Sequence, residues 1–440
     1  MKTSAFSYLW QGAGLRRLMQ MLLRSVIGLA SSLLGNAVIF LIIAFSVGPA
    51  EFGVFAKSYA SVSLLVLAVD FGYQQRILYG LEDYREKFGG LPARILYLKL
   101  TLAVTAIIAL APLTMLLDAA PLIVASVAMG LLSLSFGHIG GAVLRAMGEH
   151  GRDSAHLLIS SVAGCLYAAA IAMLEYNSVA LFSLAFPIIG LLYFGLSAKT
   201  AATRIRWIRE GFSFGAIKSE FRDGISFASD MIVVRSYGLA DVLILAIFAS
   251  PTAIGIYQIG QKFMQMILPV AQVLTNVVLP ILSRRFRATG AATGVLIVLL
   301  IVLGVAAAVA AGLFLVVSNL IVSYGLDSAY DPVRALLPIF AITVAIRLWA
   351  VAPSLWLVAA GSQTIRLAGN LLSLLAYIGL LFWLTPSYGA FGAALATAIA
   401  GGILFILYLI GTRYARRSAL PESERQPRVA PVEPAQKDEI

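Results

Sequence analysis

The sequence lacks the features of a disulfide-stabilised protein, a metalloprotein or a nucleotide-binding enzyme. Its single cysteine, Cys165, excludes a disulfide framework, and its three histidines, His138, His150 and His156, show no metal-ligand spacing. It has no phosphate-binding glycine loop, zinc motif or nucleophile elbow, so no cofactor is expected. Only 12% of the 440 residues are charged, whereas 60% are hydrophobic. A soluble chain cannot bury so much apolar surface, and the composition therefore predicts an integral membrane protein.

The longest stretch without ionisable residues lies near the end of the chain. Residues 367–412 hold 46 positions without Asp, Glu, Lys, Arg or His. A single helix of this length would be roughly 69 Å long at about 1.5 Å per residue, whereas the hydrocarbon core of a bilayer is about 30 Å thick. The segment Thr385-Pro386-Ser387-Tyr388-Gly389 interrupts it near the middle. We therefore expect two spanning helices joined by a tight turn.

Long apolar segments recur along the whole chain and predict about twelve transmembrane helices. They lie at about 25–48, 56–77, 95–117, 119–147, 154–174, 177–198, 224–249, 255–282, 293–317, 332–359, 366–385 and 388–411.

The basic residues are distributed unevenly between the two sides of these spans. Of 32 Lys and Arg residues, 26 lie in the amino-terminal segment, in every second loop or in the tail. Five lie within spans (Lys57, Lys99, Arg235, Lys262 and Arg347), and only Arg334 lies in the other loops. By the positive-inside rule, both termini are expected in the cytoplasm. The net charge of +11 thus reflects topology and does not indicate a nucleic-acid partner.

The spans divide into two related halves. We expect a first six-helix lobe at 1–198, a basic cytoplasmic linker at 199–223, a second six-helix lobe at 224–411 and a disordered tail at 412–440. The linker suits either a helix in the headgroup region or a solvated connection. A shift of 202 residues aligns the segment from Gly48 to Gly53 with that from Ser250 to Gly255, keeping Pro and Gly. Six spans per unit predict a parallel repeat about a pseudo-two-fold axis.

Three segments resemble one transporter family. They are GPAEFGVFAKSYA (48–60) with Asp70-Phe71-Gly72, then Asp241 with Gly255-Ile256-Tyr257, and finally PSYGAFGAALATAIA (386–400). This set resembles the Wzx-type polysaccharide flippases of the multidrug/oligosaccharidyl-lipid/polysaccharide exporter superfamily, which also contains the MATE drug antiporters and the lipid II flippase.

The resemblance implies a particular fold and activity. It implies an all-α, MATE-like membrane fold with two six-helix lobes around a cavity that opens alternately to each side of a bacterial inner membrane. The implied substrate is a polyprenyl-diphosphate-linked oligosaccharide, and polysaccharide polymerases or assembly proteins are possible partners. The sequence departs from the family at Val242, where a basic residue usually follows the aspartate of the seventh span.

Ionisable residues inside spans are costly and are therefore candidates for function. Arg347, Arg235, Lys262 and Lys57 could pair with a diphosphate, which cannot cross hydrocarbon unpaired. Three carboxylates, Asp241, Asp70 and Asp230, could bind H⁺ or Na⁺ and couple transport to an ion gradient. The structural alternatives are cross-helix pairing for Arg347 and snorkelling to the interface for the lysines.

Two other functions remain as alternatives. An ion-coupled multidrug antiporter would favour acidic residues in the cavity. A membrane polymerase or glycosyltransferase would need a sizeable outer loop, but the longest one, at about 318–334, carries only Asp327, Asp331 and Arg334 as charged residues. We therefore expect a transporter, with membrane lipids around it, and not an enzyme.

Overall fold

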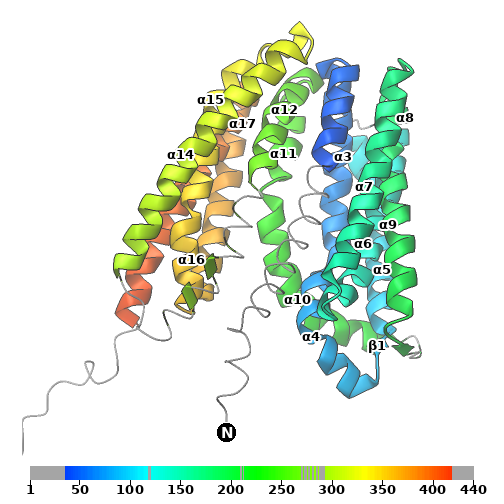
Figure 1. The fold of residues 1–440 in the computed structure, drawn as a ribbon. Helices are drawn as coiled ribbons and strands as arrows, with labels where there is room; N and C mark the ends of the chain where they lie inside the picture. Colours follow the sequence, from blue (N-terminus) through cyan, green and yellow to red (C-terminus); the bar gives the residue numbers. More distant parts are fainter. Residues whose placement is uncertain are drawn as a thin grey trace, which may run out of the picture.

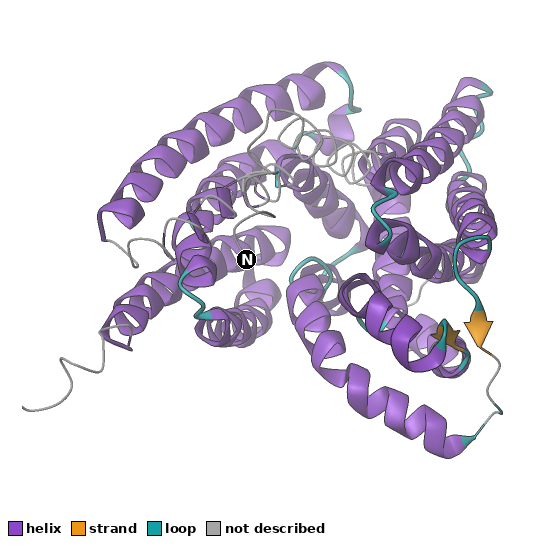
Figure 2. Cartoon of the chain, turned by 60° about the horizontal axis from the view of Figure 1, so that its bottom comes forward, coloured by secondary structure: helices purple, strands orange, loops and turns teal. Residues whose placement is uncertain are grey.

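The computed structural model describes residues 35–116, 120–208, 211, 213–268 and 293–418, together with single residues between 271 and 286. Its helices form two groups that lie close together at the top of Figure 1 and farther apart at the bottom. Figure 2 shows the same two groups side by side, with the bottom of the molecule turned forward. The bottom carries α4 and the strand β1, and we call it the basic end because the basic loops lie there.

The first lobe consists of the helix at 35–46 and of α3 to α9. Within it, α3 packs against α5 and α6, and α6 packs against α9. Its labelled elements are α3 (Pro49–Asp70), α4 (Tyr73–Phe88), β1 (Leu91–Pro92), α5 (Arg94–Leu116), α6 (Pro121–Ala146), α7 (His150–Met173), α8 (Val179–Ser183) and α9 (Ala185–Ala202).

The second half of the chain forms a second group, in which α14 and α17 both pack against α15. Its elements are β2 (Trp207–Ile208), α10 (Phe214–Ser236), α11 (Ala240–Phe248), α12 (Pro251–Ile267), α14 (Thr293–Tyr324), the 3₁₀ turn η1 (Ser328–Tyr330), α15 (Val333–Trp349), α16 (Val351–Ala359) and α17 (Gln363–Ser418). We use "second lobe" for α11 to α17.

The predicted transmembrane architecture is confirmed. Each of the twelve predicted spans has helical residues in the structure. Among the described residues, eight helices are long and apolar enough to cross a bilayer by length and composition. Many of their outward side chains are large and apolar, such as Ile108 on α5 and Val305 on α14, which are 69% and 63% exposed. Such surfaces are stable against lipid and would be unfavourable in water.

The predicted turn in the long uncharged stretch is also present. Gly389 interrupts α17 with φ 54° and ψ −130°, a conformation that a residue without a Cβ adopts at little cost. Hydrogen bonds then join the two halves of α17 in antiparallel order. Ser373 Oγ donates to the carbonyl of Ala400 at 2.9 Å, and Tyr408 OH donates to Asn370 Oδ1 at 2.6 Å.

The seventh span is not one continuous helix. α10 ends at Ser236 and α11 begins at Ala240, so Gly238 lies in the break. α10 also begins at Phe214, before the predicted start of the span at 224, so the last part of the predicted linker is helical. Another part of that linker, β2, pairs in parallel with β1 and so joins the first lobe at the basic end.

The two parts of the seventh span are attached to different lobes. α10 packs mainly against α3, α4 and α5 and has a smaller contact with α17, whereas α11 packs mainly against α17 and has a smaller contact with α3. Glu220 on α10 is fully buried between two arginines of the first lobe, Arg76 Nη1 at 2.5 Å and Arg94 Nε at 3.1 Å. A buried carboxylate needs such partners, and they hold α10 against the first lobe.

At the end opposite the basic end, α3 and α12 cross in close contact. A Cβ built on Gly53 would overlap the carbonyl oxygen of Pro251, and a Cβ on Gly255 would overlap that of Pro49. The contact is reciprocal, as the predicted repeat requires, because each glycine lies four residues after the proline of its own helix. Only glycine permits this backbone approach. The crossing therefore closes the molecule at this end.

This crossing makes a prediction about stability. We expect Gly53→Leu or Gly255→Leu to reduce the folded yield strongly, because the side chain must push two backbones apart. The matched controls are Val54→Leu and Ile256→Leu, whose native side chains are only partly buried. Detergent-solubilised, monodisperse protein measured by size-exclusion chromatography gives the yield. Equal yields for all four variants would contradict the close crossing.

Candidate functional site

A cavity of about 530 Å³ lies between the lobes, and it gathers most of the predicted site residues. Its walls come from the helix at 35–46 and from α3, α6, α10, α12 and α15, together with Asp241 at the start of α11 and Thr397 on α17. Five of the seven predicted residues line it: Asp70, Arg235, Asp241, Lys262 and Arg347. On α3 and α12 the lining begins at Tyr59 and Gln258, after the close crossing, and continues toward the basic end.

The other two predicted residues are not part of this lining. Lys57 is 5% exposed on α3, one turn from Gly53, and does not line the cavity. Asp230 belongs to α10, but its side chain lies outside the described residues.

Asp70 is the centre of a buried charged cluster in the first lobe. It ends α3, just before a reversal in which Phe71 and Gly72 both have positive φ. Lys99 Nζ lies 3.7 Å from its Oδ1, and Arg235 Nη1 donates to its Oδ2 at 3.2 Å. Ser135 Oγ also donates to Oδ1. Asp70 therefore balances two cations, one from α5 and one from α10.

The two cations differ in their surroundings. Lys99 is 1% exposed and sits near the rings of Tyr73 and Phe136, at 5.8 Å and 5.3 Å. The side chain of Arg235 is 47% exposed and lines the cavity. Lys99 thus depends on Asp70 for its charge partner, whereas Arg235 is also open to other anions.

Asp241 is held by neutral donors among the described residues. It is 1% exposed and accepts the backbone N–H of Val242 at 2.8 Å and the hydroxyl of Tyr257 at 2.7 Å. Gln261 Nε2 donates to the same Oδ2 as Tyr257. Thr397 Oγ1, which lies 3.3 Å from the Tyr257 hydroxyl, extends this network to α17. The break at Gly238 permits this network, because it places Asp241 in the first turn of a new helix, α11.

Lys262 and Arg347 add two further cations from α12 and α15. Lys262 Nζ lies 3.7 Å from the centre of the Phe40 ring and is 3.1 Å from Gln265 Oε1. The guanidinium of Arg347 lies 5.8 Å from the centre of the Tyr237 ring. Aromatic faces stabilise cations in this way without neutralising them. In the described part of the chain, neither residue has a carboxylate within salt-bridge distance, so both remain available to an anion.

Sequence reasoning missed several residues of the site. Lys99 was recognised only as a basic residue within a span, yet it is the buried partner of Asp70. Its position inside an apolar helix was the signal that could have identified it. Tyr257 and Thr397 lie in segments that resemble the family, but that resemblance assigned them no role, and Gln261 has no such signal. Only the packing brings the three residues to Asp241.

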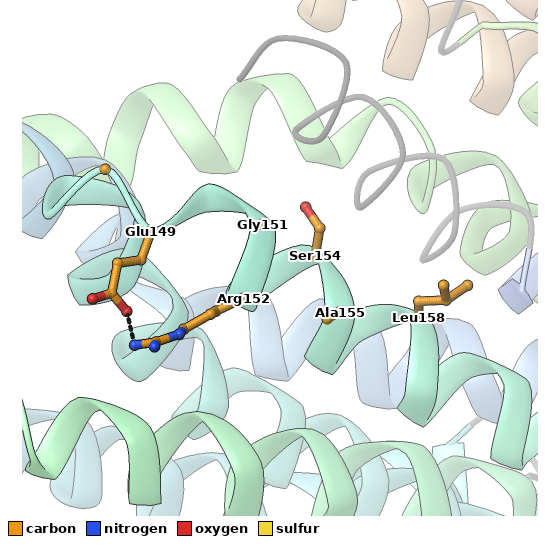
Figure 3. A pocket seen from close by; sticks show the side chains of 7 residues that line it. Glu149, Gly151, Arg152, Ser154, Ala155 and Leu158 are labelled. Carbon is orange, nitrogen blue, oxygen red and sulfur yellow. Dashed lines mark hydrogen bonds and ion pairs between the residues drawn. The ribbon is translucent and has the colours of Figure 1, made fainter. Parts of the chain in front are cut away.

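A second hollow, of about 620 Å³, lies at the start of α7 and contains none of the predicted residues. Glu149 accepts a hydrogen bond from Arg152 at 2.7 Å (Figure 3), and Arg204 pairs with the same carboxylate at 3.1 Å. These exposed pairs satisfy one another at the surface, so the hollow offers no buried charge to a ligand.

Comparison with known proteins agrees with this architecture. The chain matches the family model "Polysaccharide biosynthesis protein" over residues 21–286, more than half of its length, and it belongs to this family. A comparison with curated protein sequences gives no match.

Solved structures show the same fold. The lipid II flippase MurJ in an inward closed conformation aligns with a TM-score of 0.69 at 13% identity, over 89% of this chain and 87% of that one. An inward-facing MATE multidrug transporter aligns with a TM-score of 0.58 at 15% identity, over 90% and 98% of the two chains. The MATE transporter VcmN of Vibrio cholerae gives 0.55 at 17% identity, over 92% and 97%. The predicted superfamily fold is therefore confirmed.

The Asp70 cluster predicts unequal effects of removing its two cations. Lys99→Met should lower the free energy of unfolding by about 3–5 kcal/mol, because it leaves Asp70 buried beside one exposed partner. Arg235→Met should lower it by about 0–1 kcal/mol, because its contact is partly exposed. Thermal unfolding of the purified variants gives the order. An equal loss of stability in both variants, or a larger loss for Arg235→Met, would show that the burial of the cation does not decide how much its pairing with Asp70 stabilises the protein.

Proposed function

We propose that this member of the polysaccharide biosynthesis protein family moves a polyprenyl-diphosphate-linked oligosaccharide across a bacterial inner membrane, from the cytoplasmic to the outer leaflet. The observation that carries the proposal is the cavity between the lobes, into which three helices bring Arg235, Lys262 and Arg347. Such transport breaks no bond, so the protein needs no catalytic acid or base and is not proposed to be an enzyme.

The charges of the cavity suit a diphosphate. Its described side chains include three cations against two carboxylates, Asp70 and Asp241, and Lys99 adds a further cation behind Asp70. Each cation at membrane depth costs about 2.5–3.5 kcal/mol on insertion scales, so an excess of them calls for an anionic partner. Arg347, which has no carboxylate partner among the described residues, can bind phosphate oxygens through two N–H groups, with Arg235 or Lys262 completing the site.

Neutral groups of the cavity suit the sugar part of the substrate. Asn36 donates to the hydroxyl of Tyr59 at 2.9 Å, and both line the cavity together with Ser63 and Gln258. Amide and hydroxyl groups exchange hydrogen bonds readily with sugar hydroxyls. A volume of about 530 Å³ falls within the range of about 300–1,000 Å³ that is common for ligand sites.

The shape of the molecule suits one half of an alternating cycle. The crossing of α3 and α12 closes the cavity at one end, and the lining extends toward the basic end. If the basic end faces the cytoplasm, as the distribution of Lys and Arg predicts, this conformation receives substrate from the inner leaflet. Separation of α3 from α12 would then open the opposite side.

Asp241 is the carboxylate best suited to couple transport to H⁺ or Na⁺. Its described hydrogen-bond donors are all neutral, and the cations Arg347 and Lys262 act on it only from beyond salt-bridge distance, so a bound cation would give it a direct charge partner. Asp70 already balances Lys99 and Arg235 and is less suited to this role. Asp230 stays a candidate from the sequence alone.

The alternative function is an ion-coupled drug antiporter, because MATE multidrug transporters have a similar fold. The excess of cations in the cavity disfavours the binding of a cationic drug. A polymerase or glycosyltransferase has no support from the described outer loop, where Asp327 caps η1 and Asp331 pairs with Arg334 at 3.1 Å.

The cationic site predicts the effect of substitutions on export. Arg347→Ala should abolish export of the surface polysaccharide and leave the protein in the membrane. Arg347→Lys should retain part of the activity if charge suffices, and little if two-point contact is required. Export and the accumulation of the lipid-linked unit on the cytoplasmic side are the measurements, and Arg334→Ala, outside the cavity, is the control.

A triple variant gives the decisive result for this mechanism. Normal export from a stably inserted protein with Arg235, Lys262 and Arg347 all changed to Ala would exclude a cationic site for the substrate. Gene deletion that leaves polysaccharide unchanged but alters drug tolerance would favour the antiporter.

The orientation is tested by cysteine labelling. In a Cys165→Ala background, Ser4→Cys, Ser213→Cys and Ser418→Cys should resist an impermeant thiol reagent in intact cells, because the positive-inside rule places them in the cytoplasm. Ser328→Cys, exposed in η1 at the opposite end, should react. Labelling of Ser213→Cys together with protection of Ser328→Cys would reverse the proposed orientation.

A further inference from the structure

Arg235, one of the cations proposed to bind the substrate, already forms an ion pair with Asp70. Arg235 Nη1 lies 3.2 Å from Asp70 Oδ2, and the arginine side chain is 47% exposed. A carboxylate in this position makes the same kind of charge-assisted hydrogen bond that a phosphate oxygen would make. Asp70 and a bound diphosphate would therefore contact the same guanidinium.

Asp70 does not depend on Arg235 for its charge balance. Lys99 Nζ lies 3.7 Å from its other oxygen, Oδ1, to which Ser135 Oγ also donates. Loss of the only partner of a buried carboxylate would cost several kcal/mol. Here the loss of Arg235 leaves Asp70 with Lys99, so the guanidinium can be exchanged at a much smaller cost.

We propose that Asp70 is an internal competitor for the substrate: it holds Arg235 before substrate binds, and the diphosphate displaces it. Asp70 then sets the affinity of the site. This inference rests on the proposed function, because it takes the anionic group of the substrate to be the competing ligand.

The exchange has a consequence for the seventh span. Arg235 is in the last turn of α10, three residues before Gly238 in the break. Its pair with Asp70 ties this turn to the end of α3, whereas Glu220 ties the start of α10 to the first lobe. Displacement of Asp70 thus releases the end of α10 from α3, while Tyr237, the next residue after α10, stays hydrogen-bonded to the carbonyl of Asn370 on α17 at 2.9 Å. The start of α10 remains attached to the first lobe. Binding of an anion is thereby linked to the joint between the two lobes.

The test measures binding of farnesyl diphosphate to the purified full chain in detergent by calorimetry, with farnesol as the uncharged probe. Asp70→Asn should tighten the binding of farnesyl diphosphate by about two- to fivefold, the size expected when a partly exposed ion pair no longer competes. Asp153→Asn is the matched control. It also removes a buried first-lobe carboxylate, which pairs with Arg145 at 2.5 Å, but it lies outside the cavity and should not change the affinity.

A double-mutant cycle separates competition from simple repulsion between two anions. In an Arg235→Ala background, Asp70→Asn should give no tightening, because no guanidinium remains to be released. Undiminished tightening in that background would overturn the proposal in favour of a general field effect. The double variant Asp70→Asn with Lys99→Gln keeps the local net charge unchanged and avoids a buried unpaired lysine. It should still bind more tightly, and it serves if Asp70→Asn alone does not fold.

The outcomes also separate this inference from the proposed function. If the wild-type chain binds farnesyl diphosphate no better than farnesol, the diphosphate site itself is wrong. If the wild-type chain binds it selectively and Asp70→Asn binds it with unchanged affinity, the site stands and the competition is excluded.

Discussion

A charge inside a membrane needs a partner, and this requirement organises the centre of the molecule. The spans carry few charges, and five of the predicted charged site residues line one cavity instead of facing lipid, whereas Lys57 is buried outside it. Lys99 is paired with Asp70, whereas Lys262 and Arg347, which line the cavity, have no carboxylate within salt-bridge distance among the described residues. Lys262 and Arg347 rest against aromatic rings, which stabilise a cation and leave its charge unneutralised. The incomplete part of the network is the part that an anionic substrate would complete.

The close crossing of α3 and α12 decides where that cavity can lie. Two glycines remove the side chains that would keep these helices apart, and the largest apolar core then includes residues of both lobes, such as Phe52 and Tyr257. The lobes therefore share a core at one end and separate toward the other. A seam of glycines and apolar side chains can open at a moderate free-energy cost, which would suit the alternating opening proposed above.

The sequence was sufficient for the fold but not for the contacts of the site. The uncharged stretch with Pro386 and Gly389 and the alternation of basic loops are local patterns, and they predicted the spans and the last hairpin. The superfamily was predicted from the resemblance of three segments to the flippases. Five residues of the cavity could be predicted from their charge alone, because ionisable residues inside membrane spans are costly and usually have a role. The pairing of Asp70 with Lys99 and Arg235 joins residues that are far apart in the sequence, 165 positions in the case of Arg235, so only the packing shows it.

The divided seventh span shows why those pairings matter for mechanism. A continuous helix from 224 to 249 would belong to one lobe, and a ligand bound to a charge on it would act on that lobe alone. The break at Gly238 instead leaves Arg235 with Asp70 of the first lobe and Asp241 with Tyr257 and Gln261 of the second. An anion that binds Arg235 and a cation that binds Asp241 would therefore act on opposite sides of one joint. Because a ligand shifts a conformational equilibrium only through its different affinity for the two states, this joint is where both ligands can exert such a difference.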